Sequence, residues 1–300
     1  MGLLNHLFKK SSHVDKTTSV ETKEGSSSYG PDTVYHEIGI ALSGGSARGF
    51  AHIGVLKALD EHGMSPDIVS GTSMGALIGV LYSAGLNTDH ILKLVKKDRV
   101  FNMVSLRFGQ NGLFELNAVR RILKNEIPYD DFTALKKPFY LSVTNLNQGV
   151  NEVKGEEGPL FDYVLASCSV PVIIMPQIIN QTMYVDGGLF DNLPAASIKD
   201  KCRTLIGVHV NYNGPMENLN GLSNIAQRTF SLGIEQNVVE SRKMCDFMIE
   251  PEDMKDFTFL DFDRVDELVE IGYKATVKLI HEELTPVLRK DRLENEETGV

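Results

Sequence analysis

The sequence predicts an α/β protein, a three-layer α/β/α fold with a mostly parallel central sheet. Two observations lead to this fold class. Apolar runs rich in β-branched residues alternate along the chain with segments of helical periodicity, the pattern of repeated βα units. In addition, residues 43–49 and 71–75 are glycine-rich and lie between a predicted strand and a predicted helix, where a tight turn favours small residues.

The first part of the fold is expected as two successive βα units. Residues 36–42 (HEIGIAL) end in an apolar run typical of a buried strand, and residues 47–62 carry apolar side chains at helical spacing. Residues 67–72 (DIVSGT) form the second strand, and the apolar run 74–85 suits a buried helix. Gly63 is placed as a C-cap, and the N-cap candidates for a helix at 88–98 are Asn87, Thr88 and Asp89.

The alternation continues to the end of the chain. Further strands are expected at 138–146, 181–186 and 204–211, with a short one near 246–250, and further helices at 115–126, 160–168, 218–243 and 263–288. Residues 11–34 are rich in Ser, Thr, Lys, Glu and Gly, so residues 1–34 are predicted to be a disordered polar tail. One domain is therefore expected over 35–288, followed by a charged tail over 289–300.

Composition excludes several classes of function. The net charge of −10 argues against a nucleic-acid partner, which usually requires a basic face. The odd, widely spaced cysteines, Cys168, Cys202 and Cys245, form neither a disulfide framework nor a metal-binding motif. Neither a metal nor another cofactor is therefore expected. Cysteine usage, the order of charges in the first ten residues and the lack of a long apolar run together favour a cytoplasmic location.

The glycine loop at residues 43–49 (SGGSARG) exposes backbone N–H groups to an anion at the start of a helix. A nucleotide phosphate would need Lys after Gly49, where Phe50 stands, and a dinucleotide loop would need glycine in place of Ser46. A tetrahedral oxyanion remains, with amides near Gly45 and Ser46 as donors. Arg48 opposes the helix dipole, so it either faces this anion or pairs with a structural carboxylate.

The segment Gly71-Thr72-Ser73-Met74-Gly75 matches G-x-S-x-G at a strand-to-helix turn, the setting of a nucleophilic serine. An ordinary turn is the alternative. A serine nucleophile needs a base, and no histidine stands out: His209 is expected inside a strand, and His52 inside the core. Asp186, at the end of a strand, can take the proton directly, although Asp-Gly-Gly is also good turn chemistry.

These segments together resemble the patatin-like phospholipase family, particularly its single-domain bacterial members, over residues 36–211. The glycine loop resembles the family's oxyanion loop, which is D-G-G-G-x-R/K-G in plants, and Ser73 lies in the position of its nucleophile. Residues 166–171 (ASCSVP) resemble the segment A-S-x-S-x-P. Residues 186–194 (DGGLFDNLP) resemble the block D-G-[GA]-x-x-x-N-x-P.

The resemblance implies a patatin-like acyl-hydrolase domain that cleaves fatty-acyl esters through an acyl-enzyme. It implies a Ser73–Asp186 dyad and an oxyanion hole made by the amides of Gly44, Gly45 and Ser46, aided by Arg48. The remaining motif glycines are Gly49, Gly71, Gly75, Gly187 and Gly188. Ser46 departs from the pattern, because many members have glycine there, so its donor role depends on the backbone conformation that serine adopts.

The expected partner is an acyl-ester lipid. Residues 101–114 are unusually apolar and either form a mobile lip for acyl chains or pack on the core. A lip implies transient contact with a bilayer or micelle, and hence a peripheral place at the inner face of the membrane. Two rivals remain open, namely acyl transfer or thioester hydrolysis on the same dyad, and a non-catalytic adaptor. Helix 218–243 is either a dimer face or internal packing.

Overall fold

A computed structural model describes residues 35–97, 116–171, 173–211, 214–215 and 222–285. The two predicted tails and the apolar segment 101–114 lie outside these residues. Within the described residues, no helix combines the length and the hydrophobicity needed to cross a bilayer.

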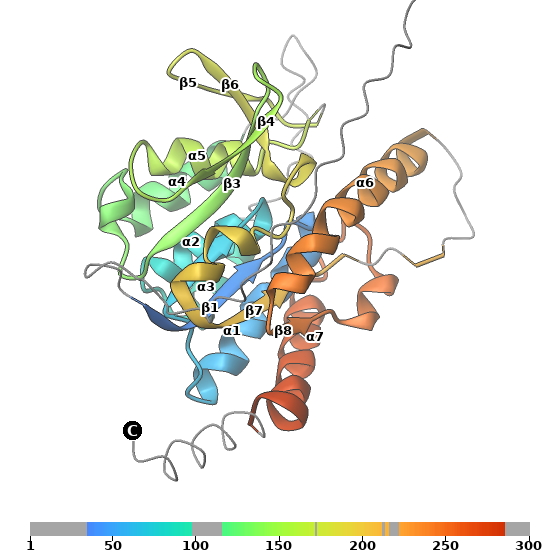
Figure 1. Ribbon diagram of the computed structural model, residues 1–300. Coiled ribbons are helices and arrows are strands. Elements are labelled where there is room, and N and C mark those ends of the chain that lie inside the picture. Colours follow the sequence, from blue (N-terminus) through green and yellow to red (C-terminus); the bar gives the residue numbers. More distant parts are fainter. Residues whose placement is uncertain (1–34, 98–115, 172, 212–213, 216–221, 286–300) are drawn as a thin grey trace, which may run out of the picture. The chain divides into compact units, whose positions relative to one another are not determined.

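One eight-stranded sheet organises the fold, with the strand order β5-β6-β3-β2-β1-β7-β8 and β4 paired to β3 (Figure 1). The pairs formed by β2, β1, β7 and β8 and the pair β2–β3 are parallel, whereas β3–β4, β3–β6 and β5–β6 are antiparallel. The strands are β1 His36–Leu42, β2 Ile68–Gly71, β3 Phe139–Asn145, β4 Val150–Lys154, β5 Gln177–Ile179, β6 Thr182–Asp186, β7 Cys202–Val208 and β8 Phe247–Ile249.

Seven α-helices accompany this sheet in the described part of the chain: α1 Ala51–Glu61, α2 Met74–Ser83, α3 Thr88–Lys97, α4 Asn117–Glu126, α5 Leu160–Ser167, α6 Leu222–Met244 and α7 Val265–Leu279. A 3₁₀ turn at Ser46–Phe50 leads into α1, and a π-helical turn at Ile280–Leu284 follows α7. Another 3₁₀ turn, Gly187–Leu189, directly follows β6.

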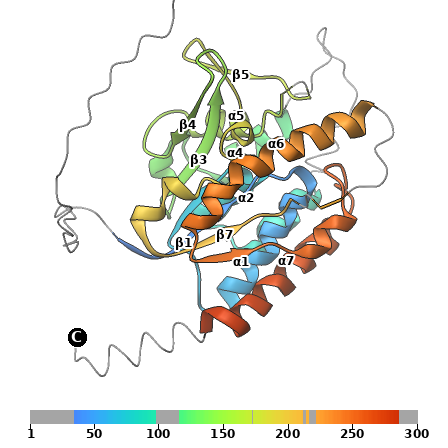
Figure 2. The same cartoon turned by 45° about the vertical axis from the view of Figure 1, so that its right-hand side comes forward.

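Successive side chains of a strand point to opposite faces of the sheet, and apolar packing covers both faces. In β1, Ile40 and Leu42 belong to the larger core, which α1, α2, α5 and α7 complete. Ala41 faces the other way, toward a smaller cluster that includes Leu205 and α6 residues such as Val238. Figure 2 shows α6 apart from the α1–α7 pair, consistent with helices on both faces. The predicted three-layer α/β/α fold with a mostly parallel sheet is confirmed.

The predicted caps are also found. Gly63 adopts a left-handed φ of +71°, and the N–H of Met64 after it bonds back to the carbonyl of Leu59, closing α1. Among the three N-cap candidates, Asn87 accepts a hydrogen bond from the N–H of His90 at 2.8 Å. The strand predicted at 204–211 instead runs from Cys202 to Val208, so its end was misplaced.

Two short strands were missed by the sequence patterns. In β4, Val150 and Val153 point to opposite faces of the sheet, and both are exposed, at 42% and 43%. It therefore lacks the buried apolar face that identifies a strand in a sequence. β5 has three residues, one of which, Ile178, is 70% exposed, and so it also gives a weak signal.

Strand register brings the candidate residues to one edge of the sheet. Leu42, the last residue of β1, pairs with Gly71, the last residue of β2, so the glycine loop and Ser73 both leave the carboxyl edge. On β3, Leu141 pairs with Gly71, and Val143, two residues further on, pairs with Asp186. The last residue of β6 thus lies at the level that Ser73 occupies just past β2.

Candidate active site

Ser73 lies in a strained turn between β2 and α2. Its φ of +55° and ψ of −121° place it in a conformation that side chains other than glycine rarely adopt. The turn needs glycine on either side because the backbones are very close. A Cβ on Gly71 would lie 2.5 Å from the carbonyl oxygen of Gly75, and one on Gly75 would lie 2.2 Å from that of Leu42. This is the geometry of a nucleophile elbow.

The backbone of Ser73 is held by the segment after α5. The hydroxyl of Ser167 accepts a hydrogen bond from the N–H of Ser73 at 2.9 Å and donates to the carbonyl of Ser142 on β3 at 2.8 Å. The thiol of Cys168 donates to the carbonyl of Ser73 at 3.2 Å. Burial raises the pKa of this thiol well above its ordinary value, so Cys168 stays neutral. Hydrogen bonds therefore hold both the N–H and the carbonyl of Ser73.

Asp186 is buried at the end of β6, with a side chain 3% exposed. Burial raises its pKa to about 6, and hydrogen bonds from the Ser73 side chain and the Gly188 N–H oppose that rise. The Gly188 bond to Oδ1 measures 2.8 Å. The structure thus brings Ser73 and Asp186 together, with a carboxylate whose proton affinity is matched to work near neutral pH.

The glycine loop lies against the same serine. A Cβ on Gly44 would lie 3.1 Å from the Cβ of Ser73, so the loop backbone faces Ser73 directly. The N–H of Gly44 donates to the carbonyl of Asn192 at 3.0 Å and is therefore already bonded. Gly45 and Ser46 remain as donors from the predicted set. Ser46 has a φ of +51°, a left-handed conformation that explains why glycine suits this position.

The other motif glycines serve close packing around the site. A Cβ on Gly49 would lie 2.3 Å from Cγ of Met74, the residue that begins α2. A Cβ on Gly187 would lie 2.4 Å from the carbonyl oxygen of Ser142, and one on Gly188 would lie 2.9 Å from Oδ1 of Asn192. The glycine loop, the elbow and the aspartate loop (residues 186–192) are therefore in mutual contact.

Arg48 lies in the 3₁₀ turn of the glycine loop, and its side chain extends toward residues 257–261. Its Nε and Nη2 donate to the carbonyl of Phe257 at 3.0 and 2.6 Å, and its guanidinium lies 4.7 Å from the ring centroid of Phe259. Burial lowers the pKa of Arg48 to about 10, and the nearby Asp261 opposes that effect. Nη1 is buried and has no hydrogen-bond partner among the described residues. These partners are a backbone carbonyl and an aromatic ring, so the contacts are not the ion pair with a structural carboxylate that was one of the two expectations for Arg48.

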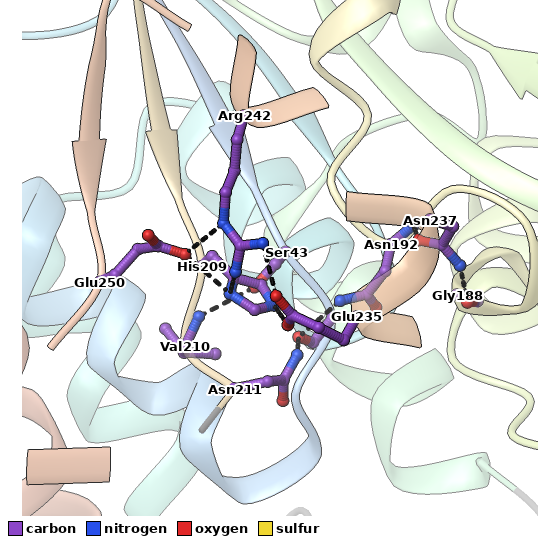
Figure 3. Close-up of polar contacts among 11 residues, drawn as sticks. Ser43, Gly188, Asn192, His209, Val210, Asn211, Glu235, Asn237, Arg242 and Glu250 are labelled. Atoms are coloured by element: carbon purple, nitrogen blue, oxygen red, sulfur yellow. Dashed lines mark hydrogen bonds and ion pairs between the residues drawn. The ribbon is translucent and has the colours of Figure 1, made fainter. Parts of the chain in front are cut away.

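No histidine in the described residues is hydrogen-bonded to Ser73 or Asp186. His52 is buried, contacts the carbonyl of Ser43 at 2.8 Å through Nε2, and has its pKa lowered to about 4 by burial. His209 was placed wrongly inside a strand, because β7 ends at Val208 and His209 is the first residue beyond it. Figure 3 shows His209 between Glu250 and Arg242, each with a contact of 3.1 Å to its Nδ1.

Several residues of this neighbourhood were not singled out from the sequence. Ser167 and Asn192 lie inside quoted motifs but had no assigned role, whereas Asn211 and Asn237 lie in no motif. Asp191 is a second carboxyl group in the aspartate loop; it is partly buried, and desolvation raises its pKa to about 6. Its backbone carbonyl accepts a hydrogen bond from the Thr72 hydroxyl at 2.8 Å. The pattern of a single chain carries no signal for such contacts, which join segments far apart in sequence.

Comparison with known proteins matches the segments that form this site. The model of the family described as patatin-like phospholipase matches residues 40–198, which include the glycine loop, the elbow and the aspartate loop. The chain belongs to the patatin-like phospholipase family. The match ends at the 3₁₀ turns that follow the aspartate loop, so β7, β8, α6 and α7 lie outside the matched segment.

The curated relatives that the chain matches are much longer than the chain, which spans less than a fifth of their length. Lysophospholipase NTE1 of Eremothecium gossypii is 29% identical over 287 residues, covering 82% of this chain and 18% of that protein. Lysophospholipase NTE1 of Saccharomyces cerevisiae is 27% identical over 277 residues, covering 78% of this chain and 16% of that protein. Among solved structures, VipD from Legionella pneumophila is similar with a TM-score of 0.44 and 16% identity, over 78% of this chain and 67% of that one.

Proposed function

We propose that this chain is a serine lipid acyl hydrolase that works through a Ser73–Asp186 dyad and an acyl-enzyme. The observation that carries the proposal is the pairing of a serine at a strained elbow with a buried aspartate that its hydroxyl contacts. An ordinary turn needs neither feature, because strain at a non-glycine residue persists only where the surroundings enforce it. Membership of the patatin-like phospholipase family supports the same reading.

The dyad needs no histidine because Asp186 can itself act as the base. With a pKa of about 6, its carboxyl group is mostly ionised at neutral pH and still basic enough to accept a proton. Asp186 takes the proton of the Ser73 hydroxyl as Oγ attacks the ester carbonyl. When the tetrahedral intermediate collapses, the same proton passes to the leaving alcohol. Water then releases the fatty acid from the acyl-enzyme, with Asp186 again as the base.

The oxyanion of both tetrahedral intermediates is assigned to the glycine loop. The N–H groups of Gly45 and Ser46 are the donors of choice, since the Gly44 N–H is bonded to Asn192. Losing one such donor costs about 3 kcal/mol of transition-state stabilisation in comparable sites. Arg48 adds positive charge beside the loop, and its contacts with Phe257 and Phe259 hold it there.

The proposed substrate is an acyl ester of a glycerophospholipid that carries one fatty chain. This choice follows the relatives, which are lysophospholipases; the relative from Eremothecium gossypii matches 82% of this chain. Such a substrate is delivered from a micelle or a bilayer surface, so transient contact with lipid is part of the proposal. A cytoplasmic location and peripheral membrane contact both remain predictions.

The test uses a fluorescent fluorophosphonate and a lysophospholipid on the purified wild type, Ser73→Ala and Asp186→Asn. We expect labelling and fatty-acid release by the wild type, neither by Ser73→Ala, and a fall of 10²- to 10⁴-fold in Asp186→Asn. Acyl transfer to an added alcohol at the expense of fatty acid would instead identify an acyltransferase. A folded wild type that neither labels nor cleaves any ester contradicts the enzyme proposal and favours an adaptor.

A further inference from the structure

Two asparagines from outside the family-matched segment reach the candidate active site. Asn211 lies three residues beyond β7, and Asn237 lies on α6. Figure 3 shows the side chains of Asn211 and Asn237 near Asn192, in the same close-up as Ser43 and Gly188. Each of the two contacts a loop that carries part of the proposed reaction centre, so each contact can be examined separately.

Asn211 holds the glycine loop. Its Nδ2 donates to the carbonyl oxygen of Gly44 at 2.8 Å, and its side chain is buried. The peptide bond between Gly44 and Gly45 is planar and trans, so its C=O and N–H point in opposite directions. Fixing the carbonyl of Gly44 therefore fixes the direction of the Gly45 N–H, which is the first proposed oxyanion donor.

Asn237 holds the aspartate loop. Its Nδ2 donates to the carbonyl of Gly188 at 2.9 Å, and its Oδ1 accepts from the N–H of Asn192 at 3.0 Å. One amide side chain thus bridges both ends of the turn that follows Asp186. The N–H of Gly188 is in turn the group that donates to Asp186. A displacement of this turn would move the donor away from the carboxylate.

Asn192 joins the two loops. Its backbone carbonyl accepts the Gly44 N–H at 3.0 Å, and its Nδ2 lies 3.4 Å from the Gly44 carbonyl oxygen. The contacts run in sequence from α6 through Asn237 and Asn192 to Gly44, where Asn211 adds a second hold. The base and the oxyanion donors are therefore linked by a continuous set of amide contacts.

We propose that Asn211 and Asn237 are positioning residues that hold the oxyanion donors and the base of the dyad in register. This inference rests on the proposed function, because it assigns a role within that reaction. Neither residue touches Ser73, so both act through the loops that they hold. A misplacement of reacting groups by about 1 Å costs on the order of 100-fold in rate. Removing either side chain is expected to lower kcat by about 10- to 100-fold.

The test compares wild type, Asn211→Ala and Asn237→Ala with Gln236→Ala, which removes an exposed side chain beside Asn237 on the same helix. Active sites are counted by fluorophosphonate labelling, the unfolding midpoint is measured, and kcat and KM are determined with a p-nitrophenyl ester. We expect both asparagine variants to lose kcat per labelled site with KM changed less than about threefold, and Gln236→Ala to match wild type. A merely structural role would lower the number of labelled sites and leave kcat per site unchanged.

The outcomes separate the two proposals. An active wild type whose asparagine variants keep full kcat per labelled site overturns the positioning role alone. A wild type that neither labels nor cleaves the ester overturns the proposed function and this role with it. If an alanine variant does not fold, Asn211→Asp or Asn237→Asp replaces it. Each keeps the side-chain size, removes the amide donor and carries the same expected loss of kcat.

Discussion

Replacing the proposed base by its neutral isostere should make the protein more stable as well as inactive. Asp186 is buried, and its pKa lies at about 6 instead of the ordinary 3.8. The folded state therefore binds the proton more tightly than the unfolded state, and stability falls as the pH rises through this interval. A pKa difference of one corresponds to about 1.4 kcal/mol. The ionised carboxylate accordingly costs up to about 3 kcal/mol above pH 6.

Asp186→Asn removes that cost and keeps the shape of the side chain. Its Oδ1 can still accept the Gly188 N–H, and its amide can donate to the Ser73 hydroxyl, so little else is lost. We expect the variant to match wild type near pH 4 and to gain up to about 3 kcal/mol of unfolding free energy near pH 8. Urea unfolding at steps of about one pH unit measures this difference.

Asp253→Asn, which removes an exposed carboxylate, serves as the control for general charge effects. The reasoning is refuted if Asp186→Asn shows a difference that is constant with pH, or if the variant is less stable than wild type at pH 8. Either result would mean that burial does not raise the proton affinity of this group. The same variant should lose hydrolysis by 10²- to 10⁴-fold, the range for loss of a general base.

Three further predictions concern the same neighbourhood. The kcat/KM of wild type should fall as the pH drops through about 6, because Asp186 must be ionised to act as the base. The Asp191 carboxyl group also has a pKa of about 6, but Asp191→Asn should show the same fall in kcat/KM at low pH. Gly75→Ala should unfold or inactivate the protein, because its Cβ would lie 2.2 Å from the carbonyl oxygen of Leu42 on β1. Gly233→Ala on α6 meets open space, so the free energy of unfolding measured in urea should rise by about 0.5–1 kcal/mol. Cys168 should react with a maleimide only after unfolding, since it is 6% exposed and burial raises its pKa, and mass spectrometry under native and denaturing conditions checks this.

The sequence was sufficient for the elements that bury a continuous apolar face. β1 was predicted with both of its ends correct, because Ile38, Ile40 and Leu42 are followed directly by the glycine loop. β4 and β5 were missed because Val150 and Val153 of β4 and Ile178 of β5 are exposed, and because both strands are stabilised by pairing with β3 and β6. Strand pairing is a long-range property, and a local pattern does not record it.

The candidate site divides along the same line. Ser73 and Asp186 could be predicted because glycine-rich turns at strand ends leave a local signature. The bonded state of the Gly44 N–H could not, since its acceptor, Asn192, lies 148 residues further along the chain. The wrong placement of His209 has a local cause: the apolar run continues through Val210 after the strand pairing has ended at Val208.

Burial of Asp186 accounts both for its suitability as the proposed base and for its cost in stability. An exposed aspartate has a pKa near 4 and is too weak a base to draw a proton from a serine hydroxyl at useful rates. Desolvation raises that pKa to about 6, and the bonds from Ser73 and Gly188 stop it from rising so far that the group would be neutral at pH 7. A base tuned in this way depends on the aspartate loop keeping the Gly188 N–H in place. The proposed chemistry therefore requires both a buried carboxylate, which costs stability, and the amide contacts by which Asn237 holds the aspartate loop.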